Sequence, residues 1–264
     1  MLRHLACSAA CVAATLFSLS ATAQTTVVDP DNLGDWLIFP TGPVPVEFNT
    51  DQASTGAGSL AFGPVSSTPE DKFLMAPPYG TADFIAAGGP DPLLSEFVSF
   101  VYDFYPSAGS ADNFYLNVYV DIDGDGPAVS FYDCRYDYVP SGTTGAWNTF
   151  TVNTATAPTL VTAQGGSTCP ADLGGAGVND VILYMVMNGG QSTAADAGLT
   201  GSWDNVQLTV GGTTTTWDFE PIAEPPVSGP TPPATPPAPI PAVPFGGLLL
   251  LIGALVALGR RFSR

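Results

Sequence analysis

Hydrophobic residues in the middle of this chain recur mostly with a period of two, which predicts β-strands rather than helices. In 114–121, for example, Phe114, Leu116, Val118 and Val120 alternate with Tyr115, Asn117, Tyr119 and Asp121. Similar runs lie between turns rich in Gly, Pro and Asp. We expect strands at 36–39, 46–49, 59–62, 72–75, 96–105, 114–121, 130–139, 147–152, 181–188, 203–210 and 213–219.

This series of strands predicts an all-β fold. About ten or eleven short strands in roughly 200 residues are typical of an antiparallel jelly-roll β-sandwich. Both faces of 181–188 are apolar, so we expect that strand in the centre of a sheet. We also expect Trp36 to pack against Trp217 and Phe219, which would close the sandwich where its two ends meet.

Apolar segments flank this region on both sides. Residues 1–23 fit a secretory signal peptide, because Arg3 and His4 precede an apolar stretch and Ala21-Thr22-Ala23 fits a cleavage site. Near the other end an apolar run precedes three arginines, which predicts a transmembrane helix with a cytoplasmic basic tail. We therefore expect a signal peptide at 1–23, a sandwich ectodomain at 24–220, a Pro-rich linker at 221–244, and the helix and tail at 245–264.

The C-terminal segment consists of a Pro-containing motif, the apolar run and a basic cluster. Its motif and cluster residues are Ile240, Pro241, Ala242, Val243, Pro244, Arg260, Arg261 and Arg264. The layout resembles the sorting signals of exosortase-type systems of Gram-negative bacteria, the PEP-CTERM and IPTL-CTERM class, although Ala242 and Val243 depart from the Ile-Pro-Thr-Leu tetrapeptide. The resemblance implies an exosortase-like membrane protease as partner, and a cell-surface or extracellular location. A plain, unprocessed membrane anchor is the alternative.

Charge and histidine content exclude several classes of function. The chain has 24 carboxylates and a net charge of −18, and between the two terminal signals its only bases are Lys72 and Arg135. Nucleic acid is excluded as a partner because it requires a basic surface. The single histidine, His4, lies in the signal peptide. Ser-His-Asp triads and His-ligated zinc are therefore excluded from the exported part.

Two cysteines, Cys134 and Cys169, remain after the signal peptide. Exported proteins fold in an oxidising compartment, so we expect these two to form a disulfide. A pair of free thiols is the alternative.

Two strings of residues resemble the jelly-roll carbohydrate-binding modules of the galactose-binding-like superfamily. They are the string Gly-Ala-Gly-Ser-Leu-Ala-Phe at 56–62 and the string Trp-Asp-Asn-Val-Gln-Leu at 203–208. The resemblance implies a structural calcium ion near these strands, where Glu47, Asp51 and Asp204 are the nearest carboxylates. The alternative is that these acids are surface residues or turn caps.

A second candidate calcium site comes from the residues themselves. Asp121, Asp123 and Asp125 alternate before Gly126, as in D-x-D-x-D-G calcium loops. The twelfth position of the loop is Tyr132 rather than the bidentate Glu of an EF-hand. Asp-Gly is also a strong hairpin signal, so a plain acidic turn is the alternative.

Aromatic side chains on strands are candidates for stacking on sugar rings. The candidates are Tyr115, Tyr119, Tyr132, Tyr136, Tyr138 and Trp147. The alternative is core or cross-strand packing, which is the commoner role of aromatic stripes. Arg135 lies between Asp133 and Asp137, which predicts an ion pair or, alternatively, contact with a carboxylate-bearing ligand.

These observations favour a non-catalytic, surface-sorted protein of the envelope or exopolysaccharide matrix. One alternative is a carbohydrate-binding module, with or without calcium. A second alternative is a secreted glycoside hydrolase acting through two carboxylates.

Overall fold

The structure is a computed structural model, and it describes residues 24–68, 70–79, 92–124, 131–190 and 197–222. These residues belong to one compact unit. The predicted signal peptide, the membrane helix and all of the Pro-rich linker after residue 222 lie outside the described residues. Within the described part of the chain, no helix is long and apolar enough to cross a membrane.

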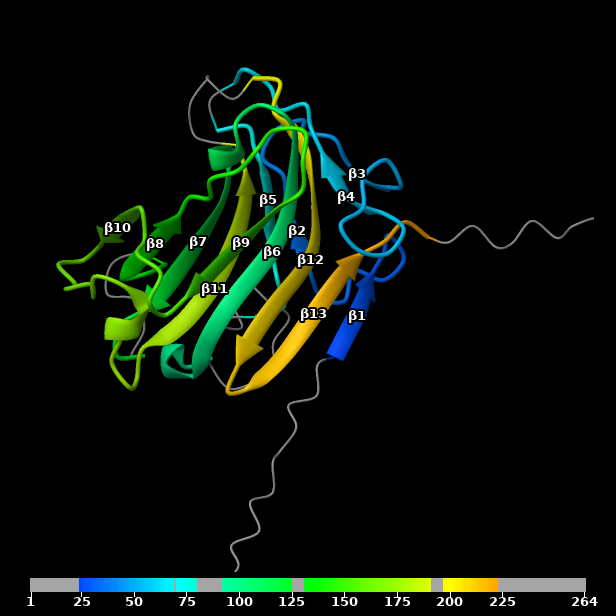
Figure 1. Ribbon diagram of the computed structural model, residues 1–264. Helices are drawn as coiled ribbons and strands as arrows, with labels where there is room; N and C mark the ends of the chain where they lie inside the picture. The colour runs from blue at the N-terminus through cyan, green and yellow to red at the C-terminus, as the bar shows by residue number, and fades with distance from the viewer. Residues whose placement is uncertain (1–23, 69, 80–91, 125–130, 191–196, 223–264) are drawn as a thin grey trace, which may run out of the picture. The chain divides into compact units, whose positions relative to one another are not determined.

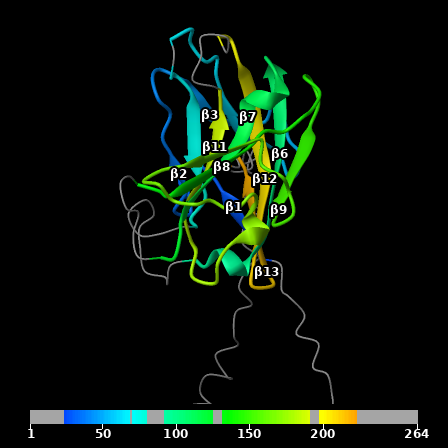
Figure 2. The same cartoon turned by 90° about the vertical axis from the view of Figure 1, so that its left-hand side faces the viewer.

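The fold is all-β and contains two sheets. The first has seven strands: β1 (Gln24–Val28), β3 (Val46–Asn49), β4 (Ser59–Phe62), β6 (Phe97–Ala108), β9 (Asn148–Asn153), β12 (Thr200–Val210) and β13 (Thr213–Phe219). Strand β12 pairs with β6 along one edge, and with β13 and then β4 along the other. Figure 1 shows β6, β12, β13 and β1 side by side, and Figure 2 shows β9 beyond β6.

The second sheet has six strands in the order β10-β8-β7-β11-β5-β2. They are β2 (Leu37–Ile38), β5 (Phe73–Ala76), β7 (Phe114–Asp121), β8 (Cys134–Tyr138), β10 (Leu160–Ala163) and β11 (Val181–Gly189). All of its pairings are antiparallel, whereas β1 and β13 of the first sheet are parallel. Three short 3₁₀ turns, Leu94–Glu96, Ala111–Asn113 and Leu173–Gly175, lie between strands.

The core lies between the inner faces of the two sheets. Trp203 of β12 is fully buried, and its ring lies 5.1 Å from that of Tyr102 and 5.0 Å from that of Phe114, centroid to centroid. Leu116, Val118 and Val120 belong to the same buried cluster, as their period-two spacing predicts. The intervening residues of β7 point to the outer face of the second sheet.

Trp36 closes one end of the sandwich. Its ring centroid lies 5.5 Å from that of Trp217 and 5.0 Å from that of Phe219, both in edge-on geometry. The three side chains are buried. These contacts confirm the predicted packing of Trp36 against Trp217 and Phe219.

The predicted strands agree with the observed strands in most places, and two strands were missed. Strands β3, β4, β7 and β13 have the expected bounds, and β11 lies between β7 and β5 with both faces buried. Strands β1 and β10 were not predicted. Both are short and largely exposed, with burial patterns that show no apolar alternation.

Candidate functional site

A groove on the outer face of the second sheet gathers both aromatic and polar side chains. It encloses about 250 Å³. We call it the outer groove, and its lining is Phe39, Lys72, Leu74, Tyr115, Asn117, Tyr119, Phe131, Arg135, Asp137, Tyr184, Val186 and Asn188. Most of these residues are the outward-facing members of strands β5, β11, β7 and β8.

Antiparallel pairing aligns the outward-facing residues in rows across the sheet. Tyr184 of β11 pairs with Tyr119 of β7, which pairs with Arg135 of β8. The next row runs from Val186 through Asn117 to Asp137. One row is therefore mainly aromatic and its neighbour mainly polar, although the residues come from three separate parts of the chain.

Four rings form an aromatic cluster at one end of the outer groove: Tyr119, Phe131, Tyr132 and Tyr184. The centroids of Tyr119 and Tyr184 lie 4.4 Å apart, and Phe131 stacks on Tyr184 at 5.8 Å with an angle of 15° between the rings. Tyr132 packs edge-on against Tyr119 at 5.2 Å. Phe131 is 55% exposed, so part of this cluster presents an aromatic face to solvent.

A chain of hydrogen bonds crosses the sheet beside the aromatic cluster. Asn188 donates from Nδ2 to Oδ1 of Asn117 at 2.9 Å, and Asn117 donates from Nδ2 to Oδ1 of Asp137 at 2.7 Å. Arg135 donates from Nε to Oδ1 of Asp137 at 2.8 Å and from Nη2 to Oδ2 at 2.9 Å. This polar chain fixes the orientation of the four side chains, and the bidentate contact confirms the predicted ion pair of Arg135.

The electrostatics of the outer groove follow from partial burial. Burial lowers the pKa of Lys72, and the nearby charge of Arg135 acts in the same direction, while Glu70 and Asp137 oppose them. Burial opposes protonation of Arg135 as well, but the hydrogen bond and charge of Asp137 raise its pKa. Burial raises the pKa of Tyr119 to about 12. The lining of the outer groove thus combines two basic side chains, one acidic side chain and three phenols.

Two of the predicted stacking residues do not reach this surface. Tyr136 and Tyr138 of β8 are buried to 0% and 1% exposure, and they belong to the core between the sheets. Their prediction as sugar-stacking residues is wrong, because the inner face of β8 carries the even-numbered residues. Core packing, the alternative, is what the structure shows.

Two further predicted stacking residues, Tyr132 and Trp147, also lie outside the lining of the outer groove. Tyr132 is a buried member of the aromatic cluster and packs against Tyr119 and Phe131. Trp147 packs on Tyr105 with centroids 5.6 Å apart and is not part of the groove lining. Sequence reasoning did find Tyr115, Tyr119 and Arg135.

Sequence reasoning missed Tyr184 and Phe131. The run 181–188 is apolar on both faces, so its outward-facing residues could not be told from its core residues. A register shift between Ile182 and Tyr184 further breaks the period of two. Phe131 lies just before β8, next to residues outside the described ranges, and only the fold brings it to Tyr184.

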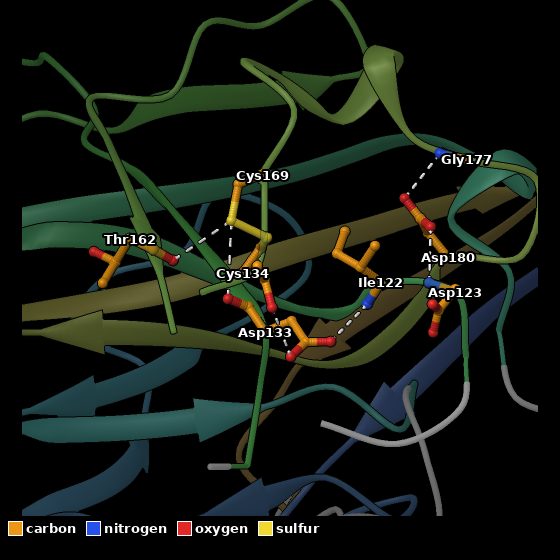
Figure 3. The surroundings of a disulfide bond; sticks show 9 residues. Ile122, Asp123, Asp133, Cys134, Thr162, Cys169, Gly177 and Asp180 are labelled. Atoms are coloured by element: carbon orange, nitrogen blue, oxygen red, sulfur yellow. Dashed lines mark hydrogen bonds between the residues drawn. A yellow bond between two sulfur atoms is a disulfide. The ribbon is translucent and has the colours of Figure 1, made fainter. Parts of the chain in front are cut away.

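The predicted disulfide between Cys134 and Cys169 is present. It joins the start of β8 to the segment after β10, across 35 positions of the sequence (Figure 3). Asp133, the residue before Cys134, accepts a hydrogen bond from the backbone N–H of Ile122 at 3.1 Å. The disulfide therefore lies at the end of β7, close to the acidic loop that begins at Asp121.

The described part of that acidic loop is a turn held by neighbouring carboxylates. Asp123 and Gly124 have φ values of 70° and 73°, as in hairpin turns. The backbone N–H of Asp123 donates to Oδ1 of Asp180 at 3.1 Å (Figure 3). Asp121 is buried, and Asp125 lies outside the described residues. Calcium binding by Asp121, Asp123 and Asp125 stays a prediction.

The calcium ligand set that the resemblance implies is divided between two places. Glu47 and Asp51 line a separate groove of about 270 Å³ on the first sheet, whereas Asp204 is fully buried. Among the residues that the structure describes, no group of three or more His, Cys, Asp or Glu side chains is arranged to hold a metal ion.

Asp204 instead accepts four hydrogen bonds from backbone N–H groups. Ser54 and Thr55 donate to Oδ2 at 2.9 Å each, and Asn205 and Phe219 donate to Oδ1 at 2.8 and 3.2 Å. Burial nevertheless raises the pKa of Asp204 to about 6, against these donors. Through these hydrogen bonds Asp204 connects the loop after β3 to the end of β13.

Comparisons with known proteins return structural similarities alone. No protein-family model matches the chain, and no curated protein matches it. A family 11 carbohydrate-binding module from Clostridium thermocellum, solved with a β-1,3-1,4-mixed-linked tetrasaccharide, is 11% identical, with a TM-score of 0.40 over 69% of this chain and 92% of the module. The solution structure of CtCBM11 is 14% identical, with a TM-score of 0.40 over 67% of this chain and 88% of that one. At these values the similarity does not identify a shared ligand.

Proposed function

We propose that this protein is a non-catalytic, polysaccharide-binding β-sandwich of jelly-roll type, and that the outer groove holds the sugar chain. The observation that carries this proposal is the position of the aromatic cluster directly beside the polar chain in one groove. A pyranose ring has apolar C–H faces and a rim of hydroxyl groups. Such a ligand requires an aromatic face and fixed hydrogen-bonding groups side by side.

The outer groove is suited to a chain-like ligand. Its lining comes from four adjacent strands, which extend over about 14 Å at the usual spacing between strands. Asn117 and Asp137 are held in place by the polar chain before any ligand arrives. Pre-ordered side chains lose less conformational entropy on binding, so weak individual contacts with hydroxyl groups add up to useful affinity.

The same groove is poorly suited to hydrolysis. Glycoside hydrolases need two carboxyl groups on either side of the bond that is cleaved. Among the described residues of the lining, Asp137 is the one carboxylate, and Arg135 and Asn117 bind it. These contacts support binding over catalysis as the function of the outer groove.

We further propose that the sandwich acts outside the cytoplasm. The Cys134–Cys169 disulfide supports this, because such bonds persist in oxidising compartments. Sorting by an exosortase-like protease, and display at the cell surface, rest on the sequence of residues 240–264 alone.

The test is a binding titration of the full-length protein with a panel of soluble polysaccharides that includes β-1,3-1,4-mixed-linked glucan. For a polysaccharide that binds, Phe131→Ala should weaken affinity at least about tenfold, because Phe131 is the most exposed ring of the aromatic cluster. Trp147→Ala is the matched control, since Trp147 lies outside the groove. Equal losses in both variants, or a loss in Trp147→Ala alone, would overturn the assignment to the outer groove.

A further inference from the structure

The outer groove contains both basic side chains of the described part of the protein. The chain carries 24 Asp and Glu residues, and within the described ranges Lys72 and Arg135 are its only Lys or Arg residues. Both belong to the lining of this groove. In a domain so strongly acidic, this concentration of positive charge in one groove calls for a physical explanation.

The two cations lie on opposite margins of the four-strand surface that lines the outer groove. Lys72 immediately precedes β5, and Arg135 is in β8. Strands β11 and β7, which carry Tyr184 and Tyr119, lie between them. Arg135 shares a row with Tyr119 and Tyr184, whereas Lys72 lies beside Gly190, just after the end of β11. A ligand that extends along the outer groove from these two rings toward Gly190 would therefore meet Arg135 at one end and Lys72 at the other.

The described lining of the outer groove holds two basic side chains and one acidic side chain, Asp137. Asp137 balances Arg135 through two hydrogen bonds. Lys72 lies 3.9 Å from Glu70, whose side chain is 66% exposed, whereas the side chain of Lys72 is 16% exposed. Because Glu70 is largely exposed, water screens this ion pair and weakens it. Partial burial of the Lys72 ammonium group has a desolvation cost. The lowered pKa of Lys72 indicates that Glu70 offsets this cost only in part.

Arg135 retains donors after it binds Asp137. Its guanidinium has five N–H groups, and the two hydrogen bonds to Asp137 engage Nε and Nη2. Arg135 also hydrogen-bonds the phenol of Tyr119. The N–H groups that remain after these contacts suit a second carboxylate.

We propose that the outer groove selects an acidic polysaccharide, whose uronate carboxylates pair with Lys72 and Arg135 while its rings lie on the aromatic cluster. This inference rests on the proposed function, since it assigns a charge to the sugar that the groove holds. The acidic surface elsewhere does not prevent binding. At about 0.1 M salt, charges separated by more than roughly 10 Å are largely screened, so the local cations dominate.

The test compares each polysaccharide with its own neutral form. Polygalacturonate, alginate and hyaluronate are titrated with full-length protein in buffer without divalent cations, alongside the same polymers after reduction of their carboxyl groups. The proposal expects at least one of the acidic forms to bind about tenfold or more tightly than its reduced form. Poly-glutamate, a polyanion without sugar rings, is not expected to compete.

Two variants change the charge of the groove in opposite directions. Lys72→Met removes a cation and should lower the ratio of affinities for the acidic and reduced forms about fivefold or more. Glu70→Gln removes the competing carboxylate and should raise that ratio. Circular dichroism confirms that both variants are folded.

The outcomes separate this inference from the proposed function. If reduced polymers bind as tightly as acidic ones and Lys72→Met leaves the ratio unchanged, the inference fails and a neutral-sugar groove remains. If poly-glutamate competes fully, the groove recognises charge rather than sugar, and the inference also fails. If no polysaccharide in either panel binds, both the proposed function and this inference fail.

Discussion

Tyr119 and Tyr184 face each other across neighbouring strands β7 and β11, with ring centroids 4.4 Å apart. They are cross-strand partners on the outer face of the second sheet. Their contact joins the outward-facing positions of two strands into one aromatic cluster beside a polar row, in which Tyr184 is buried and Phe131 is exposed. The fold thus places a candidate ligand surface on the sheet opposite to the one formed by its longest strands.

Asn117 occupies the middle of the polar chain. Asn117→Ala should therefore remove one hydrogen bond from Nδ2 of Asn188 and one from Oδ1 of Asp137. We expect the free energy of unfolding to fall by about 1–3 kcal/mol, since Asn117 is buried and bonded to both Asn188 and Asp137. Urea denaturation measures this change. Asn32→Ala, at an exposed position, is the matched control and should change stability by less than about 0.5 kcal/mol. Equal stability of the two variants would contradict the role given to the polar chain.

Removal of the disulfide should destabilise the sandwich without changing its fold. The bond between Cys134 and Cys169 closes a loop with a sequence separation of 35 residues, for which the loop-entropy model gives about 4 kcal/mol. We expect the double variant Cys134→Ala/Cys169→Ala to unfold at lower denaturant than the oxidised wild-type protein. Reduction of the wild-type protein should produce a similar shift, and a double variant as stable as the oxidised protein would contradict the prediction.

Asp204 should make stability depend on pH on the acidic side of neutrality. Burial raises its pKa from 3.8 to about 6 in the folded protein. A carboxyl with a higher pKa when folded binds more protons in that state, so its contribution is full below about pH 4 and is lost as pH rises through 6. Urea denaturation at several pH values, compared with that of Asp204→Asn, isolates this contribution.

The Asp204→Asn variant has a second expected effect. An amide has one oxygen, so it cannot accept from all four backbone N–H groups that Asp204 binds. We expect a loss of about 1–3 kcal/mol at pH 7, with Asp51→Asn as an exposed control. An unchanged pH slope in the Asp204 variant would show that another group titrates in this range.

Much of the fold could be predicted from the sequence because the alternation of apolar residues is a local property. Strands such as β7 and β13 alternate clearly, and their bounds are as expected. The packing of Trp36 against Trp217 was also predictable, since both lie at the ends of the strand series. Strands β1 and β10 were missed because most of their residues face solvent, so burial imposes little pattern on them.

The candidate site was much less predictable, because it depends on register between strands. The sequence shows that Tyr119, Arg135 and Asp137 are polar or aromatic, but only pairing brings Tyr184 and Lys72 to them. The same limit explains the error at Tyr136 and Tyr138. Alternation reveals that two faces exist, and the sequence alone did not reveal which face of β8 meets the core.

The most direct test of the central claim is a chemical-shift map of the sugar site. Isotope-labelled protein is titrated with the tightest-binding oligosaccharide from a glycan array, and shifts of backbone and side-chain amides are recorded. We predict that the largest shifts belong to Asn117, Tyr119, Arg135 and Tyr184 of the outer groove. Shifts gathered instead around Glu47 and Asp51, or around Trp147, would contradict the account, as would the absence of any binding glycan.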